Sequence, residues 1–319
     1  MKKKIVILGS TGSVGKTTFN ILKKNSKDFK VELLTTNKNI NEILKQAKNL
    51  KVKKIVVTNK NHYEKIKRLN NKGKIKIYNS LDVIKKIFKR KEIDYTMSAI
   101  TGVAGLKPTL DAISVSKTIA IANKESIICG WNLIEKELHK NKTKFIPVDS
   151  EHFSIWSVIK SFNKNNIEEI ILTASGGPFL NKSMNYIKNV NPKVAVKHPN
   201  WSMGKKISID SATMMNKIFE IIEALRIFKI DKSKFKILIH PKSYVHSIVK
   251  FNNGIIKIVA HDTDMKIPIF NSIYINQNNQ ILSKDIDFKV LNNLNLQEVN
   301  SKKFPVIKLL KKIPENESL

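Results

Sequence analysis

Carboxylates at three positions in the chain have the chemical type and spacing of a metal site. Asp149 and Glu151 stand two residues apart after an apolar run that ends at Val148, and Glu220 follows much later. Residues two apart on an extended segment point to the same side, so the first two carboxylates are expected to converge. Like charges so close repel unless a cation or a proton intervenes. One interpretation is a site for Mg²⁺ or Mn²⁺, which prefer hard oxygen ligands; the other is ordinary helix capping by Asp149 or Ser150.

The third carboxylate lies in a stretch, residues 211–225, that is apolar on most sides and predicts a largely buried helix. Asn216, Lys217 and Glu220 form one polar stripe on it, because residues three and four apart are neighbours. Buried charges need partners, which a metal shared with the earlier carboxylates would supply, with Lys217 facing an anionic substrate. A structural Lys217–Glu220 ion pair is the alternative. Ser211 opens the predicted helix, where backbone N–H groups and the helix dipole attract phosphate.

A glycine-rich turn, Gly-Ser-Thr-Gly-Ser-Val-Gly at residues 9–15, directly follows the first apolar run and precedes a helical stretch. In this context glycines let the backbone approach a pyrophosphate. An ATPase-type phosphate loop is excluded by spacing, since its glycine would stand where Ser10 is. A turn without a ligand is the remaining alternative. After the second predicted strand, Asn37, Lys38 and Asn39 replace the acidic residue of NAD sites, which favours the 2′-phosphate of NADPH; an ordinary surface lysine is the alternative for Lys38.

Two later loops also contain residues suited to chemistry. Residues 173–179 offer the Ser175 hydroxyl and backbone N–H groups, although a plain tight turn has the same composition. Residues 197–206 place Trp201 and Met203 in an otherwise polar loop. Such a loop is typical either of a lid that closes over a ligand or of a core anchor.

The elements that must position these residues follow from hydrophobic periodicity. Up to Val148, short apolar runs alternate with amphipathic stretches of helical length, the pattern of repeated βαβ units around a parallel sheet. The strands expected there are residues 5–8, 31–34, 55–58, 95–99, 118–122 and 145–148. Beyond it, longer loops, a helix over 211–228 and alternating segments at 247–251 and 255–260 predict a mixed α+β region.

We therefore expect an α/β protein in three parts. A Rossmann-like, NADPH-binding domain is expected at residues 1–149, an α+β catalytic domain at 150–275, and a linker with the start of a further helical domain at 276–319. No apolar run approaches the roughly 20 residues that a membrane helix needs. The single cysteine, Cys129, allows neither an intrachain disulfide nor a Cys-based metal site, and a cytoplasmic protein is expected.

The formal charge of +32 at first suggests nucleic acid or an anionic membrane as a partner. Of the 58 basic residues, however, only Arg68, Arg90 and Arg226 are arginines, and the lysines are spread along the whole chain. Readers of nucleic acid usually cluster arginine and aromatic residues on one element. The charge therefore indicates solvated faces, and specific nucleic-acid binding is the minority interpretation.

Together these segments resemble the 1-deoxy-D-xylulose 5-phosphate reductoisomerase family from Lys4 to about Pro268. The resemblance rests on the glycine-rich turn and on residues 122–126, 147–152, 175–179, 197–217 and 240–247. It implies isomerisation and reduction of 1-deoxy-D-xylulose 5-phosphate to 2-C-methyl-D-erythritol 4-phosphate in non-mevalonate isoprenoid biosynthesis. It further implies NADPH, a divalent metal and a homodimer, with the family's C-terminal helical domain largely missing here. A dehydrogenase without isomerisation is the alternative enzyme.

The resemblance also implies roles for single residues. Metal ligands are expected at Asp149, Glu151 and Glu220, which with Lys124 form the catalytic set. Contacts to the phosphorylated sugar are expected at Lys124, Ser150, Ser175, His198, Trp201, Ser211, Asn216, Lys217 and His246, with Trp201 and Met203 on a mobile flap. Contacts to NADPH are expected at Thr11, Gly12, Ser13, Val14, Asn37, Lys38, Asn39, Asn123, Glu125 and Gly204.

Overall fold

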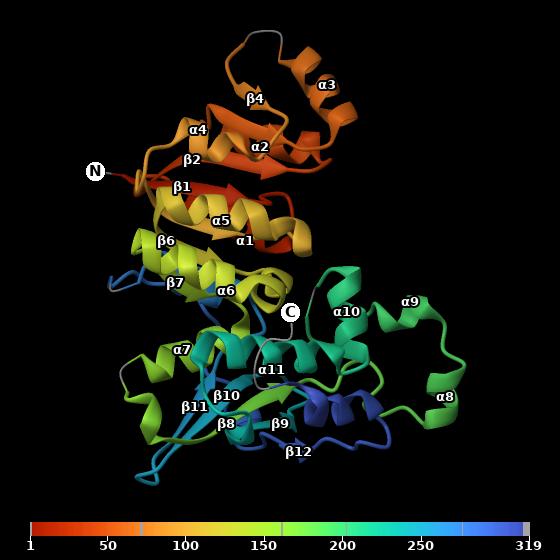
Figure 1. Ribbon diagram of the computed structural model, residues 1–319. Helices are drawn as coiled ribbons and strands as arrows, with labels where there is room; N and C mark the ends of the chain where they lie inside the picture. Colours follow the sequence, from red (N-terminus) through yellow and green to blue (C-terminus); the bar gives the residue numbers. More distant parts are fainter. Residues whose placement is uncertain (1, 71–72, 161, 202, 276, 315–319) are drawn as a thin grey trace. The chain divides into compact units, whose positions relative to one another are not determined.

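The computed structural model describes residues 2–70, 73–160, 162–201, 203–275 and 277–314 (Figure 1). The chain forms two compact units: Met1–Val148 with Pro268–Asn279, and Asp149–Ile267 with Gln280–Leu319. Asn276 and residues 315–319, which belong to the last expected domain, lie outside the described residues. No helix in the described part of the chain is long and apolar enough to cross a membrane.

Seven parallel strands form the sheet of the first unit, in the order β4-β3-β2-β1-β5-β6-β7. The strands are β1 (Lys3–Leu8), β2 (Phe29–Thr36), β3 (Lys54–Val57), β4 (Lys76–Tyr78), β5 (Ile93–Ser98), β6 (Ser116–Ile121) and β7 (Lys144–Pro147). All six strands expected in this region are confirmed, whereas the short β4 was not expected. The strand order reverses between β1 and β5, and doubly wound sheets bind ligands at such a switch point.

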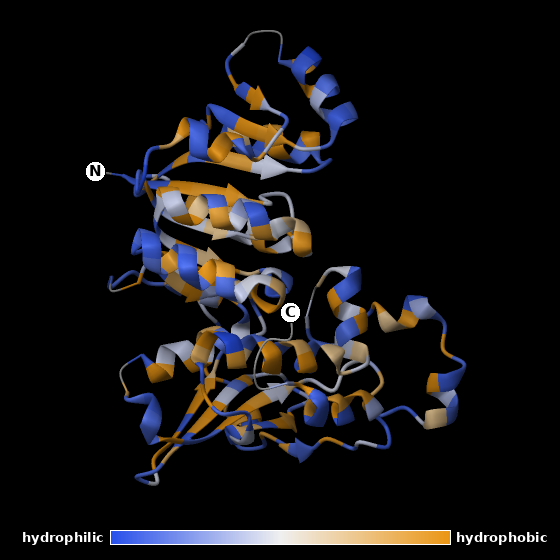
Figure 2. Cartoon of the chain, in the orientation of Figure 1, coloured by the Kyte–Doolittle hydropathy of each residue, from blue (hydrophilic) through white to orange (hydrophobic). Residues whose placement is uncertain are grey.

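Helices alternate with these strands along the chain. They are α1 (Ser13–Lys24), α2 (Ile40–Asn49), α3 (Lys60–Leu69), α4 (Val83–Ile87), η1 (Val103–Gly105), α5 (Leu106–Val115) and α6 (Lys124–Asn141). The strands carry mostly hydrophobic residues and the helices carry hydrophilic residues on part of their surface (Figure 2). The central strands are buried on both faces, as in β1, where Ile5, Ile7 and Leu8 have no exposed surface.

The chain returns to the first unit late in the sequence, at α12 (Lys266–Ile273) and the residues after it. Ile269 and Phe270 of this helix are buried. The Tyr95 hydroxyl lies 2.7 Å from the Ser272 hydroxyl, which donates to the Ile269 carbonyl. The sequence-based domain limits did not anticipate this return.

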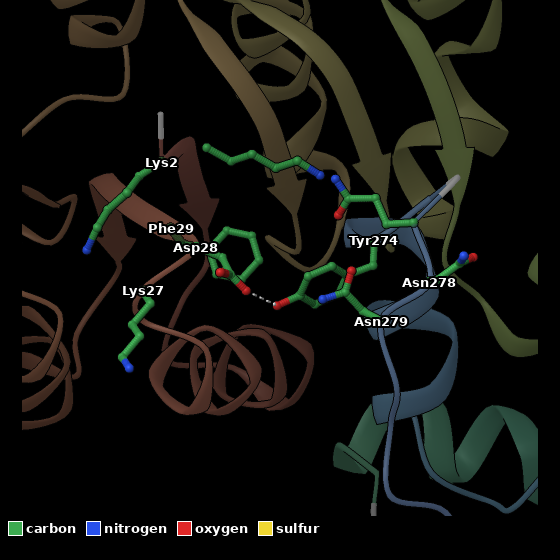
Figure 3. Close-up of a pocket in the computed structure, with 9 residues that line it drawn as sticks. Lys2, Lys27, Asp28, Phe29, Tyr274, Asn278 and Asn279 are labelled. Carbon is green, nitrogen blue, oxygen red and sulfur yellow. Dashed lines mark hydrogen bonds between the residues drawn. The ribbon is translucent and has the colours of Figure 1, made fainter.

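A cavity of about 730 Å³ lies where the returning segment meets the amino ends of β1 and β2 (Figure 3). It is lined by Lys2, Lys3, Lys27, Asp28, Phe29, Tyr274, Gln277, Asn278 and Asn279. Within it the Tyr274 hydroxyl donates to Asp28 over 3.1 Å. No predicted site residue lines this cavity, and it is at the amino edge of the parallel sheet, whereas ligands bind such sheets at the carboxyl edge. This cavity is therefore not the candidate functional site.

The second unit contains a five-stranded mixed sheet in the order β11-β10-β8-β9-β12. Its strands are β8 (Ile167–Ala174), β9 (Phe235–Ile239), β10 (Val245–Phe251), β11 (Ile256–Ala260) and β12 (Gln297–Glu298), and only β8 and β9 pair in parallel. Its helices are α7 (Ser150–Ile159), η2 (Lys164–Asn166), α8 (Met184–Lys188), α9 (Pro192–Ala195), α10 (Lys205–Ala212), α11 (Met215–Phe228), η3 (Lys232–Lys234), α13 (Phe288–Leu291) and η4 (Pro305–Lys312). Apolar residues of α7 and α11 pack with those of β8 and β10 in one core.

The single helix expected over residues 211–228 is wrong at its start. The structure has two helices, and Met214 between them adopts a left-handed backbone, with φ of 66°. Met214 is buried against Ala174, Ile239 and Phe304, and this packing over long sequence distances stabilises a break that local periodicity does not reveal. Ser211 therefore lies near the carboxyl end of α10 and does not open a helix.

Candidate metal and phosphate site

Asp149 is the N-cap of α7, and its side chain accepts a hydrogen bond of 3.3 Å from the backbone N–H of Glu151. The capping expected as an alternative is therefore present. The extended geometry assumed for these two residues is wrong, because Glu151 lies in the first helical turn. Their carboxylates still converge, since an N-cap side chain turns back over the first turn of its helix.

Asp149, Glu151 and Glu220 come together in the second unit, with one carboxylate oxygen of each within 4.8 Å of the others. Glu220 is buried, and the other two side chains are only slightly exposed. Burial, and after it the neighbouring Glu220 carboxylate, raises the pKa of Glu151 to about 7. Three carboxylates in so little space require a positive charge among them, and the donor set suits Mg²⁺ or Mn²⁺.

Lys217 supplies positive charge to this carboxylate cluster. Its ammonium lies 2.7 Å from a Glu151 oxygen and also pairs with Glu220, while the Asn216 amide donates to Glu220. Burial lowers the pKa of Lys217, but the two carboxylates outweigh it and raise the value above the ordinary one. The polar stripe expected on this helix thus faces the other two acids, and the Lys217–Glu220 ion pair weighed as an alternative is present as well.

Two residues of this region were missed by sequence reasoning. His152 is fully buried, with Nδ1 3.3 Å from Asp149 and 3.4 Å from Glu223. Burial opposes charge on the ring, but Glu223 and then Asp149 outweigh it and raise the pKa of His152 to about 9. The available signal was spacing: His152 follows Asp149, and Glu223 follows Glu220, by three positions, and such residues share a helix face.

A turn after β8 follows Ser175 and packs against the backbone of Ser211. Gly176 and Gly177 both have left-handed backbones, with φ of 79° and 65°. A Cβ on Gly177 would lie 2.8 Å from the Ser211 carbonyl oxygen, so the turn packs against the end of α10 only with glycine there. Successive backbone N–H groups in such a turn can form a concave binding site for an anion.

His198 orders both this turn and the following loop. Its Nδ1 accepts the backbone N–H groups of Asn200, over 3.1 Å, and of Trp201, over 3.0 Å. The proton of the neutral ring is therefore on Nε2, which donates to the Ser175 hydroxyl over 2.8 Å. Burial lowers the pKa of His198 to about 4, in agreement with a neutral ring. Since Ser175 also accepts from Gly177 N–H, its own hydroxyl proton can be donated to a ligand.

The loop that carries Trp201 is anchored by Asn200, a residue that sequence reasoning also missed. The Asn200 amide donates to the Pro241 carbonyl over 2.6 Å and to the Ser243 hydroxyl over 2.8 Å. Trp201 packs edge-on against His246, with ring centroids 6.0 Å apart. The predicted lid residue and the predicted site histidine are therefore neighbours.

The glycine-rich turn in the first unit follows β1 and leads directly into α1. A Cβ on Gly15 would lie 2.2 Å from the Gly9 carbonyl oxygen, so the turn closes only with glycine at that position. Gly12 is the N-cap of α1, and no side chain caps this helix. The Thr11 and Thr36 hydroxyls lie 2.7 Å apart. Ser13 and Val14 form the start of α1, where backbone N–H groups lack helical partners.

Other predicted cofactor and substrate residues lie mostly at helix starts. Asn37, Lys38 and Asn39 are exposed, and Asn39 caps α2. The buried Asn123 caps α6 and donates to the Gly102 carbonyl over 2.8 Å, so its side chain faces the protein interior. The remaining ones are Lys124 (buried) and Glu125 in α6, Ser150 (buried) in α7, Met203 in the Trp201 loop, and Gly204 as the N-cap of α10.

Comparisons with known proteins point to one family. The family model for 1-deoxy-D-xylulose 5-phosphate reductoisomerase matches residues 5–130, and that for its C-terminal domain matches residues 145–228. A 1-deoxy-D-xylulose 5-phosphate reductoisomerase from Pelagibacter ubique is 57% identical over 318 residues, which cover 99% of this chain and 82% of that protein.

Solved structures give the same result. The reductoisomerase from Zymomonas mobilis in complex with NADPH has a TM-score of 0.88 and 35% identity, and the match covers 98% of this chain and 81% of that one. A reductoisomerase in complex with NADPH, fosmidomycin and magnesium has a TM-score of 0.88 and 33% identity, with 97% and 79% covered.

Proposed function

The chain belongs to the 1-deoxy-D-xylulose 5-phosphate reductoisomerase family, and on this premise we propose that it converts 1-deoxy-D-xylulose 5-phosphate to 2-C-methyl-D-erythritol 4-phosphate. The reaction takes place in the cytoplasm, as part of non-mevalonate isoprenoid biosynthesis, and uses NADPH and Mg²⁺ or Mn²⁺. The observation that carries the proposal is the cluster of Asp149, Glu151 and Glu220, close to Lys217.

Asp149, Glu151 and Glu220 are the proposed metal ligands. Their oxygens are close enough to share one cation, and the pairing of Lys217 with two of them supports a site that attracts positive charge. A divalent cation held there would polarise the carbonyl and hydroxyl oxygens of the sugar. The chain's own contribution is to hold the three carboxylates in position and to add the charge of Lys217.

Ser175 and Ser211 are the proposed phosphate ligands, with Asn216 and Lys217 at the start of α11 and His198 behind Ser175. The support is that Gly177 packs on Ser211, and that the Ser175 oxygen accepts from His198 and from Gly177 N–H, which leaves its own proton for a ligand. Trp201 and Met203 are proposed to exclude water when the substrate is bound, and Ser150 and His246 to contact it.

The first unit is the proposed NADPH-binding domain and the second unit the catalytic domain. NADPH supplies the hydride when bound. The turn at residues 9–15, with the start of α1, receives its pyrophosphate, and the segment 37–39 receives its 2′-phosphate. The support is the position of the turn at the switch point of the sheet, between β1 and β5.

A Glu220→Gln variant tests the metal assignment. The parent protein with substrate, Mn²⁺ and NADPH is expected to consume NADPH and to give a product with a branched carbon skeleton. Loss of one charged ligand is expected to reduce kcat at least about 100-fold. Glu168→Gln, at a 46% exposed carboxylate of the same unit, is the matched control and should stay fully active. Full activity in Glu220→Gln rejects the ligand, and an unbranched product indicates a simple dehydrogenase.

A homodimer is proposed with β11 at its interface. This strand is at the edge of its sheet, and its Ile256 and Ile258 are 57% and 49% exposed. Exposed apolar edge strands associate unless something covers them, and a second copy of the chain would do so.

Ile256→Lys with Ile258→Lys is expected to convert dimers to monomers in sedimentation velocity, whereas Leu291→Lys, at a 39% exposed leucine, should not. A monomeric parent or an intact dimer in the double variant contradicts the proposal.

A further inference from the structure

A second group of ionisable side chains shares Asp149 with the proposed metal ligands. It consists of Asp149, His152 and Glu223, whose ligand-type atoms are within 4.8 Å of one another. His152 comes from α7 and Glu223 from α11, the two helices that also carry the three proposed ligands. His152 and Glu223 are buried, and nothing in the proposed reaction uses them directly.

The surroundings of the His152 ring determine where its protons are. Nε2 lies 2.9 Å from the Glu220 backbone carbonyl oxygen, which only accepts, so Nε2 is a donor. Nδ1 lies 3.3 Å from an Asp149 oxygen and 3.4 Å from a Glu223 oxygen. A lone pair on Nδ1 would face two oxygens and repel both, so a proton lies between this nitrogen and the two carboxylates. Nδ1 thus stands between one proposed ligand, Asp149, and one carboxylate that is not a proposed ligand, Glu223.

The ring touches two of the three proposed ligands by different routes. It contacts Asp149 through the side chain and Glu220 through the backbone. Phe228 stacks on its face at 6.2 Å between ring centroids, with 24° between the planes. Through these contacts the ring links the start of α7 to the middle of α11.

We propose that Glu223 is a positioning residue that, through His152, sets the spacing of Asp149 and Glu220 and thereby the affinity for the divalent cation. Glu223 shares the contact with Nδ1, so Asp149 is not drawn fully to His152 and keeps oxygen lone pairs for the cation. The inference rests on the proposed function for the identity of the ligands and adds a residue that is not a ligand. A second metal ion bound by Asp149, His152 and Glu223 is the rival, and it predicts two ions per chain.

The test measures Mn²⁺ binding to the full chain by electron paramagnetic resonance, with no turnover needed. Glu223→Gln keeps the side chain's shape and removes its charge, and it is expected to weaken Mn²⁺ binding about 10-fold, within the range for partners of metal ligands. The Mn²⁺ line shape should change, one ion should bind per chain, and NADPH affinity should stay the same. Glu168→Gln is the matched control and should resemble the parent.

Glu223→Asp keeps the charge and is expected to restore most of the affinity, which a purely structural role of Glu223 would not predict. Unchanged Mn²⁺ affinity in a folded Glu223→Gln overturns the inference, as does a parent that binds two ions and loses one in that variant. A parent that binds Mn²⁺ but does not consume NADPH with substrate overturns the proposed reaction alone. A parent that binds no Mn²⁺ overturns both.

Discussion

His198 shows how a single residue can connect a binding turn with a loop. Its Nδ1 accepts two backbone N–H groups of the Trp201 loop, and its Nε2–H donates to Ser175. The two bonds that Nδ1 accepts require the neutral ring with its proton on Nε2, because a proton on Nδ1 would face two donors. The residue therefore keeps its geometry only while it remains uncharged.

Acid is expected to release this loop. Burial lowers the pKa of His198 from 6.5 to about 4. As pH falls between these values, His198 takes up a proton in the unfolded chain but not in the folded chain. The contribution of the neutral His198 ring to the free energy of unfolding is therefore complete above about pH 6.5 and is lost as the pH falls to about 4. The fluorescence of Trp201 is obtained by subtracting the emission of the Trp201→Phe variant from that of the parent protein. This difference should change with a midpoint near pH 4. In His198→Asn, which keeps an acceptor in place of Nδ1, the transition should be absent; its persistence contradicts the assignment.

At the scale of elements, helix starts position most of the residues proposed for the site. Asp149 caps α7, Gly12 begins α1, Asn123 caps α6, and Asn216 and Lys217 lie in the first turn of α11. The first turn of a helix carries the positive end of the helix dipole, so such positions favour anions and acidic side chains. The break at Met214 matters because it creates the start of α11 where a continuous helix would have none.

The turn between β1 and α1 offers a matched pair of glycine variants. In Gly15→Ala the new methyl group would meet the Gly9 carbonyl oxygen at 2.2 Å, whereas in Gly12→Ala the same oxygen is at 3.5 Å, an ordinary contact. Gly15→Ala is expected to lower the free energy of unfolding by about 1–3 kcal/mol, as overpacking does. Gly12→Ala should change it by less than about 0.5 kcal/mol. Chemical denaturation without NADPH measures both, and equal effects contradict the packing described for the turn.

At the scale of the whole molecule, the first unit is completed by residues that follow most of the second unit in sequence. Buried side chains of α12 contribute to its core, and Tyr95 of β5 bonds to Ser272. Because Ser272 already donates to the Ile269 carbonyl, the Tyr95 hydroxyl is the donor in this pair. The two units are therefore linked by more than one passage of the chain, and the first cannot be obtained by a single cut.

A double-mutant cycle should measure this connection. Tyr95→Phe and Ser272→Ala each remove one hydroxyl of the buried pair. The two changes together are expected to cost less than the sum of the single changes, with a coupling energy of about 1 kcal/mol for one hydrogen bond. Urea unfolding of the full chain gives the four free energies. Simple additivity within about 0.3 kcal/mol contradicts a functional contact between β5 and α12.

Local pattern was sufficient to predict the strands of the first unit and the turn after β1, because alternation of apolar segments and glycine spacing act over a few residues. It also singled out Asp149, Glu151 and Glu220 as candidate ligands of a common cation, with helix capping and a Lys217–Glu220 ion pair as alternatives, since buried like charges are costly wherever they meet. The family resemblance added the identity of the ligands that these residues are proposed to bind.

Tertiary structure alone decided what depends on contacts between distant segments. The left-handed Met214 is stabilised by packing against Ala174 and Phe304, the return of α12 by the core of the first unit, and the position of the His152 ring by its contact with Glu223. In each case the energy comes from groups far apart along the chain, so no window of neighbouring residues contains it. The fold and the acids are therefore readable in the sequence, whereas the supports that hold those acids in place appear only when α7 and α11 are packed together.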